Sequence, residues 1–240
     1  MSEFPALGPG DMGSVFADFT ERWAQYSPRV LMEKPFIATL DDFVSDAEID
    51  AILGSVSSQF ARSTDQGAVD KYGEQKKVVS QGRTSENAWC IGRCDHLPET
   101  QAVLGRIANV TQVPIENFEN FQILRYLPGQ YYRTHHDMSE NDNRLASGPR
   151  IYTFFLYLSD VEEGGETNFP RLNLDVAPRK GSALLWPSVL EDQPTRQEPK
   201  TFHQAKPVIK GTKFAANSWI HMYNYREPNL WGCTGAFDAV

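Results

Sequence analysis

The sequence lacks several features that would place it at once in a large class of proteins. No apolar run reaches the roughly 18 residues of a transmembrane helix. The first residues, MSEFPALGPGDMG, have neither the basic nor the apolar segment of a signal peptide. Cysteine is scarce, and no further ligand stands at zinc-finger spacing from it. Repeats and low-complexity tracts are also missing. These absences argue against a membrane span, a zinc finger and a repeat protein.

Charge and cysteine content narrow the possible partners. The formal net charge of −8 gives no general affinity for phosphate backbones, so nucleic acid is not expected as a partner. The three cysteines stand at positions 90, 94 and 233. Cys90 and Cys94 can form a local disulfide or remain as free thiols. The sequence decides neither this pairing nor the oligomeric state.

The chain is long enough for one sizeable domain with short appendages. Its 240 residues are 40% hydrophobic and 12% aromatic, which suffices for a substantial core. We expect an N-terminal arm with a short helix around SVFADFTERWAQY over residues 1–33. The main domain should follow over 34–225, and a C-terminal tail over 226–240.

Two helices are predicted early in this main domain. Ser45 and Glu48 form a capping-box pattern, and apolar residues then recur at helical spacing. That buried stripe comprises Ile49, Ile52, Leu53, Val56 and Phe60. A second helix is expected over PETQAVLGRIANV, with Pro98 in its first turn. The polar stretch 64–86 reads as a long loop or loose hairpin, which is typical of a lid.

Short strands dominate from residue 119 onward. Turns rich in glycine, proline and aspartate separate the runs FQILRY, IYTFFLYL, SALLWP and KFAANSWIHMY. Helices followed by many short strands indicate an α+β, mainly β fold. Its core would be a jelly roll (double-stranded β-helix) buttressed by the N-terminal helices.

The stretch YYRTHHD carries the strongest chemical signal. On a strand or strand end, His135 and Asp137 lie on one face, while His136 points away. A metal site needs a third ligand, for which His203 and His221 are both candidates. Two histidines and one carboxylate form the facial triad of non-haem Fe(II) oxygenases, which leaves positions open for co-substrate and oxygen.

Lys213 favours His203 as the third ligand. It stands ten residues after His203 and could point a fixed cation into the same cavity. A dicarboxylate such as 2-oxoglutarate needs both a metal and a cation to hold its two ends. At an effective dielectric near 20, a close charge pair contributes roughly 4 kcal/mol before desolvation.

Together these segments resemble the prolyl 4-hydroxylases of the Fe(II)/2-oxoglutarate-dependent dioxygenase superfamily. The resemblance covers about residues 34–225, and it is nearest to the plant, algal, protist and collagen-type branch. It rests on RTSENAW, ILRYLPGQYYRTHHD, RIYTFFLYLSDVEEGGETNFP, APRKGSALLWP and FHQAKPVIKGTKFAANSWIH, which stand in family order. Met138 is a departure, because relatives commonly carry an aromatic residue there.

The resemblance implies roles for individual residues. His135, Asp137 and His203 match the iron ligands, and Lys213 matches the residue that holds the C5 carboxylate of 2-oxoglutarate. Further positions around that carboxylate are matched by Tyr157, Tyr126 and Thr167. The wall that faces the peptide near iron is matched by Tyr132, Arg150, Trp219 and His221. Without the resemblance, Tyr132 and Trp219 could equally be core aromatics, and Arg150 could form an ion pair at a strand end.

The resemblance also implies an activity. Fe(II), 2-oxoglutarate and O2 would hydroxylate peptidyl proline at C4, with release of succinate and CO2. Ascorbate would rescue the iron after uncoupled turnovers. The substrate would be an extended proline-rich or collagen-like peptide, which suits an aromatic groove formed by Tyr132, Trp219 and a lid residue such as Tyr72. Family membership would favour the secretory pathway.

Other readings of the same residues remain open. An oxygenase of this type could act on lysyl side chains, a nucleic-acid base or a small molecule. A non-catalytic peptide-binding jelly roll would have no need of an intact triad and Lys213. A zinc hydrolase could use two histidines and one aspartate, but it would have no need of Lys213 or Tyr157.

Overall fold

The computed structural model describes residues 4–69 and 75–234, with side chains described for 4–65 and 78–234. The helices cover short parts of the chain. They are α1 (Asp11–Phe16), α2 (Phe19–Arg22), α3 (Asp46–Val56), α4 (Pro98–Thr111) and α5 (Arg226–Leu230). Four single 3-10 turns complete the helical structure: η1 (Ala24–Tyr26), η2 (Ile115–Asn117), η3 (Glu140–Arg144) and η4 (Pro199–Thr201). Within the described ranges, no helix is long and apolar enough to cross a membrane.

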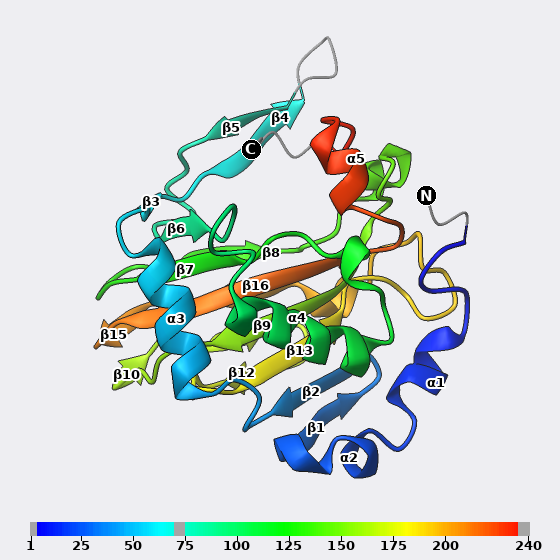
Figure 1. Ribbon diagram of the computed structural model, residues 1–240, viewed down its shortest axis with the longest axis horizontal. Helices are drawn as coiled ribbons and strands as arrows, with labels where there is room; N and C mark the ends of the chain where they lie inside the picture. The colour runs from blue at the N-terminus through cyan, green and yellow to red at the C-terminus, as the bar shows by residue number, and fades with distance from the viewer. Residues whose placement is uncertain (1–3, 70–74, 235–240) are drawn as a thin grey trace.

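An eight-stranded antiparallel sheet forms the body of the molecule (Figure 1). In spatial order it contains β1 (Pro28–Glu33), β2 (Phe36–Leu40), β13 (Ala183–Pro187), β9 (Arg150–Tyr157), β16 (Lys213–His221), β7 (Gln122–Tyr126), β6 (Glu86–Trp89) and β3 (Ala61–Arg62). The four long strand-like runs of the sequence thus supply β7, β9, β13 and β16.

Smaller sheets complete the β-structure. The second face of the roll consists of β12 (Leu174–Val176), β11 (Thr167–Phe169), β14 (His203–Ala205) and β8 (Tyr132–His135), in that order. The strands β10 (Glu163–Gly164) and β15 (Val208–Lys210) pair with each other. A separate hairpin joins β4 (Asp65–Val69) to β5 (Gln75–Val78). The jelly roll with buttressing helices predicted from the sequence is confirmed.

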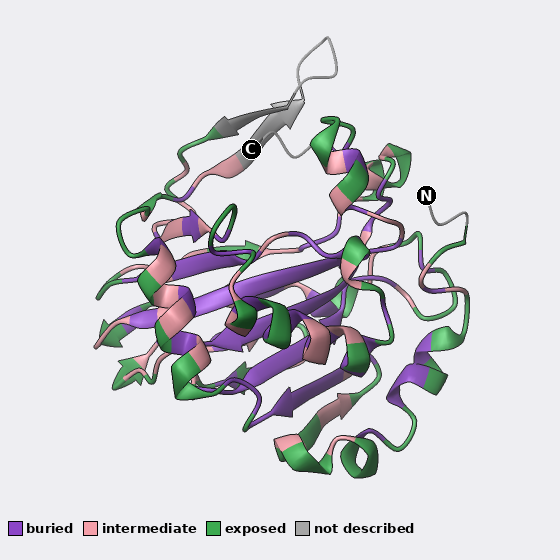
Figure 2. Ribbon diagram, viewed as in Figure 1, coloured by how far each residue is buried: buried purple, intermediate pink, exposed green. Residues whose placement is uncertain are grey.

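Alternation along the strands divides the core into two parts. On β9, Tyr152, Phe154 and Leu156 pack on the side of the helices, whereas Phe155 and Tyr157 belong to a second cluster that also contains Phe169 of β11. The helices α3 and α4 lie side by side across the outer face of the large sheet (Figure 1). Figure 2 shows the central strands buried along most of their length. The inner face of the sheet therefore looks into the roll, where the second cluster packs.

The two predicted helices of the catalytic domain are present. Ser45 caps α3 and forms the full capping box with Glu48. Ile49, Ile52 and Val56 are buried, and Leu53 and Phe60 pack against the same core while partly exposed. Pro98 begins α4.

The structure differs from the sequence prediction near the N-terminus. The single helix expected around residues 14–26 is broken into α1, α2 and η1, because Asp18 adopts a left-handed conformation with φ of 52° between the first two. Strand β1 lies within the predicted arm, and it pairs with β2 at the edge of the large sheet.

Two further features concern the sulfur atoms and the predicted lid. Cys90 and Cys94 form a disulfide, which settles the alternative left open by the sequence, and Cys233 is exposed and free. The stretch 64–86 contains the hairpin of β4 and β5, which projects from the body (Figure 1). Tyr72 lies outside the described residues.

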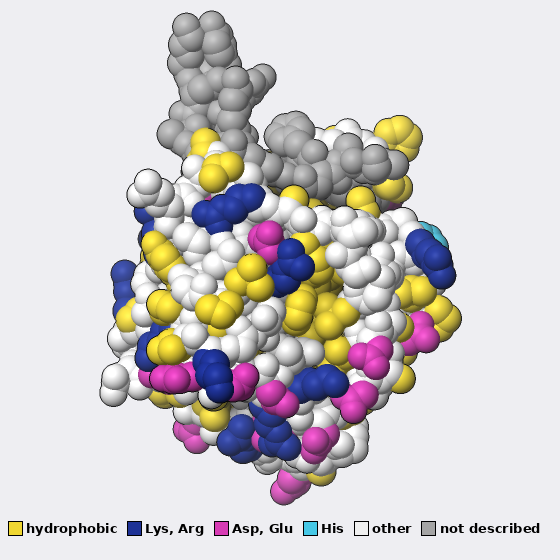
Figure 3. Space-filling view, turned by 90° about the vertical axis from the view of Figure 1, so that its left-hand side faces the viewer, with side chains coloured by type: hydrophobic (Ala, Val, Ile, Leu, Met, Phe, Trp, Pro, Cys, Tyr) yellow, Lys and Arg dark blue, Asp and Glu magenta, His cyan; other side chains and the backbone are white. Residues whose placement is uncertain are grey.

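The end of the roll that carries β10 and β15 turns toward the viewer in Figure 3, where hydrophobic side chains gather near the middle of the face and charged ones surround them. Leu127, which follows β7, is 40% exposed, and Ile209 of β15 is 61% exposed. A hydrogen bond from the Gly129 amide to the Val208 carbonyl, 2.7 Å long, joins the segments that carry these two residues.

Candidate metal centre

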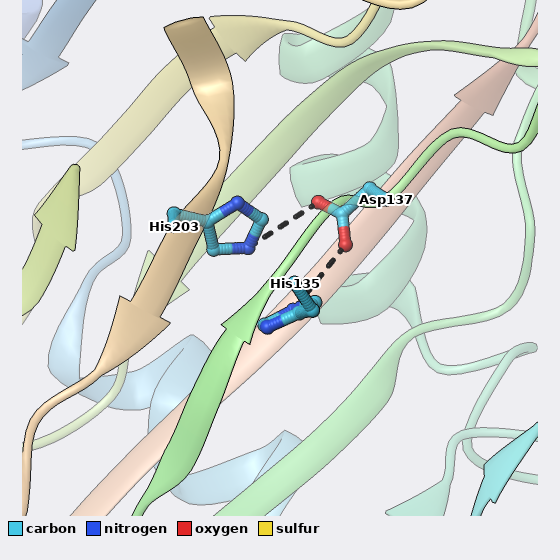
Figure 4. Close-up of side chains that lie close together, drawn as sticks. All are labelled: His135, Asp137 and His203. Carbon is cyan, nitrogen blue, oxygen red and sulfur yellow. Dashed lines mark ion pairs between the residues drawn. The ribbon is translucent and has the colours of Figure 1, made fainter. Parts of the chain in front are cut away.

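Three potential metal ligands meet on the small sheet (Figure 4). His135 ends β8 and lies opposite His203, the first residue of β14. Nε2 of His135 is 3.7 Å from Asp137 Oδ1, and Nε2 of His203 is 3.7 Å from Asp137 Oδ2. The ligand atoms of all three residues lie within 4.8 Å of one another. Within the described residues no other group of three histidine, cysteine or acidic side chains comes together in this way.

Hydrogen bonds to the backbone fix the orientation of both histidine rings. His135 Nδ1 lies 2.9 Å from the Arg133 carbonyl, and His203 Nδ1 lies 3.0 Å from the Thr201 carbonyl. Because a carbonyl oxygen can only accept, each Nδ1 carries a proton, and each Nε2 is the ring nitrogen that faces Asp137. Burial, and then the neighbouring His203, lower the pKa of His135 to about 3. That ring is therefore neutral and able to bind a metal at neutral pH.

Asp137 is held as a carboxylate in a buried setting. Burial opposes its ionisation, but the His203 and His135 rings and a hydrogen bond from Thr153 reverse this effect and hold its pKa well below the ordinary value. The Thr153 hydroxyl donates to Asp137 Oδ2 over 2.6 Å. Two imidazoles and one carboxylate, all with defined directions, fit a divalent metal of the Fe(II) type.

Lys213 lies at another part of the same interior. It is fully buried at the start of β16, and its Nζ donates to the Gly165 carbonyl over 2.7 Å. Three aromatic rings surround the ammonium group: Nζ is 5.3 Å from the centroid of Phe155, 5.4 Å from Tyr157 and 5.6 Å from Tyr126. No carboxylate of a described residue forms an ion pair with it. Burial lowers the pKa of Lys213 to about 7.

The other residues matched to the co-substrate pocket also lie beside Lys213. The Tyr157 hydroxyl donates to Thr167 Oγ1 over 2.7 Å, and both side chains are buried. Tyr126 pairs with Lys213 across β7 and β16. Burial raises the pKa of both tyrosines, so each phenol remains a hydrogen-bond donor. A buried cation beside phenolic donors fits one end of a dicarboxylate.

Aromatic contacts connect the metal ligands with Lys213. The ring of His203 lies 4.8 Å from that of Trp186, and Trp186 lies 6.2 Å from Phe155, which in turn flanks Lys213. All these side chains point between the two sheets. The triad and the buried cation therefore line one interior, as a co-substrate bound at both ends requires.

The residues matched to the peptide wall fall into two arrangements. The Arg150 guanidinium lies 3.7 Å from the Trp219 ring centroid, and its NH1 donates to the Asp137 carbonyl over 3.3 Å. Arg150 also forms the ion pair considered from the sequence, through Nε to Glu119 Oε1 at 2.6 Å. His221 bonds the same oxygen over 2.8 Å and lies outside the triad. His203 is therefore the third residue of the cluster.

Tyr132 packs against one of the candidate metal ligands, His135. Its ring stacks on His135 with centroids 3.7 Å apart, and the Arg83 guanidinium lies 4.7 Å from the centroid of the Tyr132 ring. Tyr132 is thus neither a remote core aromatic nor fully exposed. It is in direct contact with the candidate metal centre.

Two residues of the site were not singled out from the sequence. Thr153 shares its strand face with Phe155 and Tyr157, so alternation along β9 could have identified it. Glu119 gave no signal, because it lies just before β7 and meets Arg150 and His221 only in the folded chain. Burial opposes its ionisation, but Arg150 and His221 outweigh this and lower its pKa to about 2.

Comparisons with known proteins agree with this geometry. The model of the 2OG-Fe(II) oxygenase superfamily matches residues 121–221. Prolyl 4-hydroxylase 1 of Arabidopsis thaliana is 34% identical over 215 residues, covering 83% of this chain and 73% of the relative. Prolyl 4-hydroxylase subunit alpha-1 of Rattus norvegicus is 32% identical over 194 residues, but the chain spans only 35% of that relative's length.

A solved structure supports the same assignment. The viral collagen prolyl hydroxylase of Paramecium Bursaria Chlorella virus-1, solved as a complex with 2OG, shares 26% identity and a TM-score of 0.60. The match covers 80% of this chain and 98% of the viral chain. The chain therefore belongs to the prolyl 4-hydroxylase family of 2OG-Fe(II) oxygenases.

Proposed function

We propose that this chain hydroxylates peptidyl proline at C4. In the balanced reaction one O2 and one 2-oxoglutarate are consumed, one oxygen atom enters the proline ring, and succinate and CO2 are released. One observation carries the proposal. The His135, Asp137 and His203 cluster is connected to the buried Lys213 by ring contacts through Trp186 and Phe155. The plant and viral relatives, whose names state prolyl hydroxylation, support the choice of target.

His135, Asp137 and His203 would hold Fe(II), which supplies the activation of O2 that no side chain can provide. The chain's own contribution is orientation. The Arg133 and Thr201 carbonyls direct the two imidazoles, and Thr153 directs the carboxylate. A metal that arrives at this site meets three ligands already in place, so little reorganisation is needed on binding.

Lys213 would hold the distal carboxylate of 2-oxoglutarate. Its Nζ has one described hydrogen-bond acceptor, the Gly165 carbonyl, so further N–H groups remain for a ligand. Tyr157, Tyr126 and Thr167 would complete this end of the pocket. Burial of the whole set excludes water from the charge pair and strengthens it.

The peptide would lie against Tyr132, Arg150 and Trp219, beside the metal centre. Trp219 Nε1 is buried and has no hydrogen-bond partner among the described residues, so the peptide would meet the indole ring and the Arg150 guanidinium above it. His221 and Glu119 would hold Arg150 from behind. A proline-rich segment in polyproline II conformation suits such a wall, since it loses little entropy on binding.

Two features of the proposal concern the cycle as a whole. The hairpin of β4 and β5 would close over the bound peptide, as lids do in other enzymes. Ascorbate would restore the iron after turnovers that are not coupled to hydroxylation.

The test is an anaerobic incubation with Fe(II) and 2-oxoglutarate, followed by oxygen, with and without a polyproline peptide. We expect succinate to rise with peptide and one oxygen atom to be added to proline. Succinate at the same slow rate in both samples would reject proline peptides while keeping an oxygenase that acts on another target. No succinate, together with unchanged 2-oxoglutarate binding after Lys213→Ala, would overturn the proposal.

A further inference from the structure

His136 stands between two candidate metal ligands in the sequence, yet its side chain points away from the metal centre. Its Nδ1 lies 3.0 Å from the Met138 amide, and its Nε2 lies 2.9 Å from the Glu198 carbonyl and 3.2 Å from Thr201 Oγ1. The ring also packs edge-on against Phe202, with centroids 5.0 Å apart. His136 therefore bridges the segment after β8 and the segment that leads into His203.

The donors and acceptors around His136 leave one tautomer. An amide can only donate, so Nδ1 must accept from Met138. A carbonyl can only accept, so Nε2 must carry the proton and donate to Glu198. Burial lowers the pKa of His136, which is consistent with this neutral ring.

The contact reaches His203 through a single residue. Thr201 is fully buried, and its hydroxyl donates to the same Glu198 carbonyl over 3.0 Å. The backbone carbonyl of Thr201 is the group that accepts from His203 Nδ1. His136 and His203 thus bind opposite ends of one residue, so the place of His136 bears on the direction of the His203 ring.

This bridge lies where the small sheet gives least support. His203 is the first residue of β14, and it pairs with His135 next to an irregularity in the register. The preceding residues form the single turn η4 rather than a strand. The position of His203 relative to Asp137 therefore depends on two things: the pairing of β14 with β8, and the contacts that hold η4 in place.

We infer that His136 is a positioning residue for the metal centre: it anchors the 198–201 turn and, through Thr201, sets the tautomer and direction of His203. The inference rests on the metal site of the proposed function. Partners of this kind are needed because a ligand that can rotate loses part of its affinity in adopting the bound orientation.

The test uses Co(II), whose visible absorption reports the geometry of the site, titrated into the metal-free full chain. His136→Phe keeps an aromatic ring near Phe202 but removes the hydrogen bonds to Met138, Glu198 and Thr201. His136→Gln places an amide donor near the position of Nε2 and can still reach the Glu198 carbonyl. We expect His136→Phe to weaken Co(II) binding roughly 10- to 100-fold and to alter the absorption. His136→Gln should stay within about threefold of the parent.

Matched controls separate positioning from a general loss of structure. His96 is an exposed histidine, so His96→Phe should leave Co(II) binding unchanged. Thermal unfolding of each metal-free variant reports stability independently. If His136→Phe does not fold, Thr201→Val serves in its place, since it removes only the hydroxyl and should weaken Co(II) binding by a few-fold while β14 stays intact.

Three results would overturn the inference. One is a folded His136→Phe, or Thr201→Val in its place, that binds Co(II) within twofold of the parent with the same absorption. Another is His136→Gln losing as much affinity as His136→Phe. A lowered unfolding temperature with unchanged affinity would likewise mean that His136 is merely structural. A parent chain that binds no Co(II) would instead overturn the metal site itself.

Discussion

The two ends of the proposed co-substrate site are built in opposite ways. At the metal end, His135, Asp137 and His203 each have a hydrogen-bond partner that fixes their direction. At the other end, Lys213 is a buried cation with one carbonyl contact and three surrounding rings. At the metal end, the three side chains are therefore oriented before any ligand binds. At the second end, no carboxylate of a described residue forms an ion pair with Lys213.

This difference teaches how one pocket can be selective for a dicarboxylate. A metal site with a preset geometry binds its ion on ligand chemistry alone. A buried cation without a carboxylate partner is unfavourable by itself, because burial penalises the charged form. A ligand that brings a negative group to Lys213 removes this penalty. In the proposed site, selectivity for the second carboxylate would come from leaving Lys213 without a carboxylate partner.

The largest effect is expected from removing the carboxylate of the metal end. Asp137→Ala should abolish binding of Fe(II) or Co(II), because two neutral imidazoles remain and the only anionic ligand is lost. Metal content by elemental analysis and a Co(II) titration measure this. His96→Ala, at an exposed histidine, is the matched control. Stoichiometric Co(II) binding by Asp137→Ala would place the metal elsewhere.

Removing the cation of the other end should leave the metal unaffected. Lys213→Met keeps the length and apolar stem of the side chain but loses the charge. Since a close charge pair contributes roughly 4 kcal/mol before desolvation, we expect 2-oxoglutarate to bind on the order of a hundredfold more weakly. Calorimetry on the Co(II)-loaded chain measures this.

Lys206→Met is the matched control, because Lys206 is a partly exposed lysine paired with Asp175. It should bind 2-oxoglutarate like the parent. Equal weakening in the two lysine variants would contradict the assignment of Lys213. A loss of Co(II) affinity in Lys213→Met would show that the two ends are not separate.

The affinity for 2-oxoglutarate should depend on pH through Lys213. Burial lowers its pKa in the free protein to about 7, and a bound carboxylate would raise it again. Above pH 7 the free lysine loses its proton, so binding must take one up and the dissociation constant should rise up to tenfold per pH unit. Below pH 7 the lysine is already charged and its contribution is constant.

Proton uptake is measured by calorimetry in buffers of different ionisation enthalpy. The other ionisable groups near Lys213 are Tyr126, Tyr157 and Glu166, and the two phenols stay neutral over this range. Lys213→Met should show no such uptake. Uptake that persists in that variant would assign the proton to another group.

The smallest effects are expected from one hydroxyl at each end. Thr153→Val removes the donor to Asp137, and Tyr157→Phe removes the phenol beside Lys213. A hydrogen bond to a charged group contributes about 1.5–3 kcal/mol, and a neutral one about 1 kcal/mol. Thr153→Val should therefore weaken Co(II) binding about tenfold and leave 2-oxoglutarate nearly unchanged.

Tyr157→Phe should show the reverse pattern, with about a fivefold loss for 2-oxoglutarate and none for Co(II). Titration of each of the two variants with Co(II) and with 2-oxoglutarate gives four dissociation constants. If either variant weakens both ligands equally, the two ends do not act independently.

Local pattern predicted much of this arrangement. The H-x-D spacing placed His135 and Asp137 on one side and His136 on the other, and the structure agrees. The capping box of α3 and the four main strands also followed from short-range signals. The broken N-terminal helix did not, because the left-handed Asp18 that interrupts it carries no strong sequence signal.

The sequence by itself determined which side chains share a face, since a strand alternates with a period of two wherever it packs. That rule put Phe155 and Tyr157 on one side of β9 and kept Lys213 in line with Trp219 on β16. Only the tertiary structure decided which faces meet. The pairing of His203 with His135, the link from His136 to Glu198 and the meeting of Glu119 with His221 join residues distant in the chain. Such contacts depend on how sheets pack, and no local periodicity encodes them.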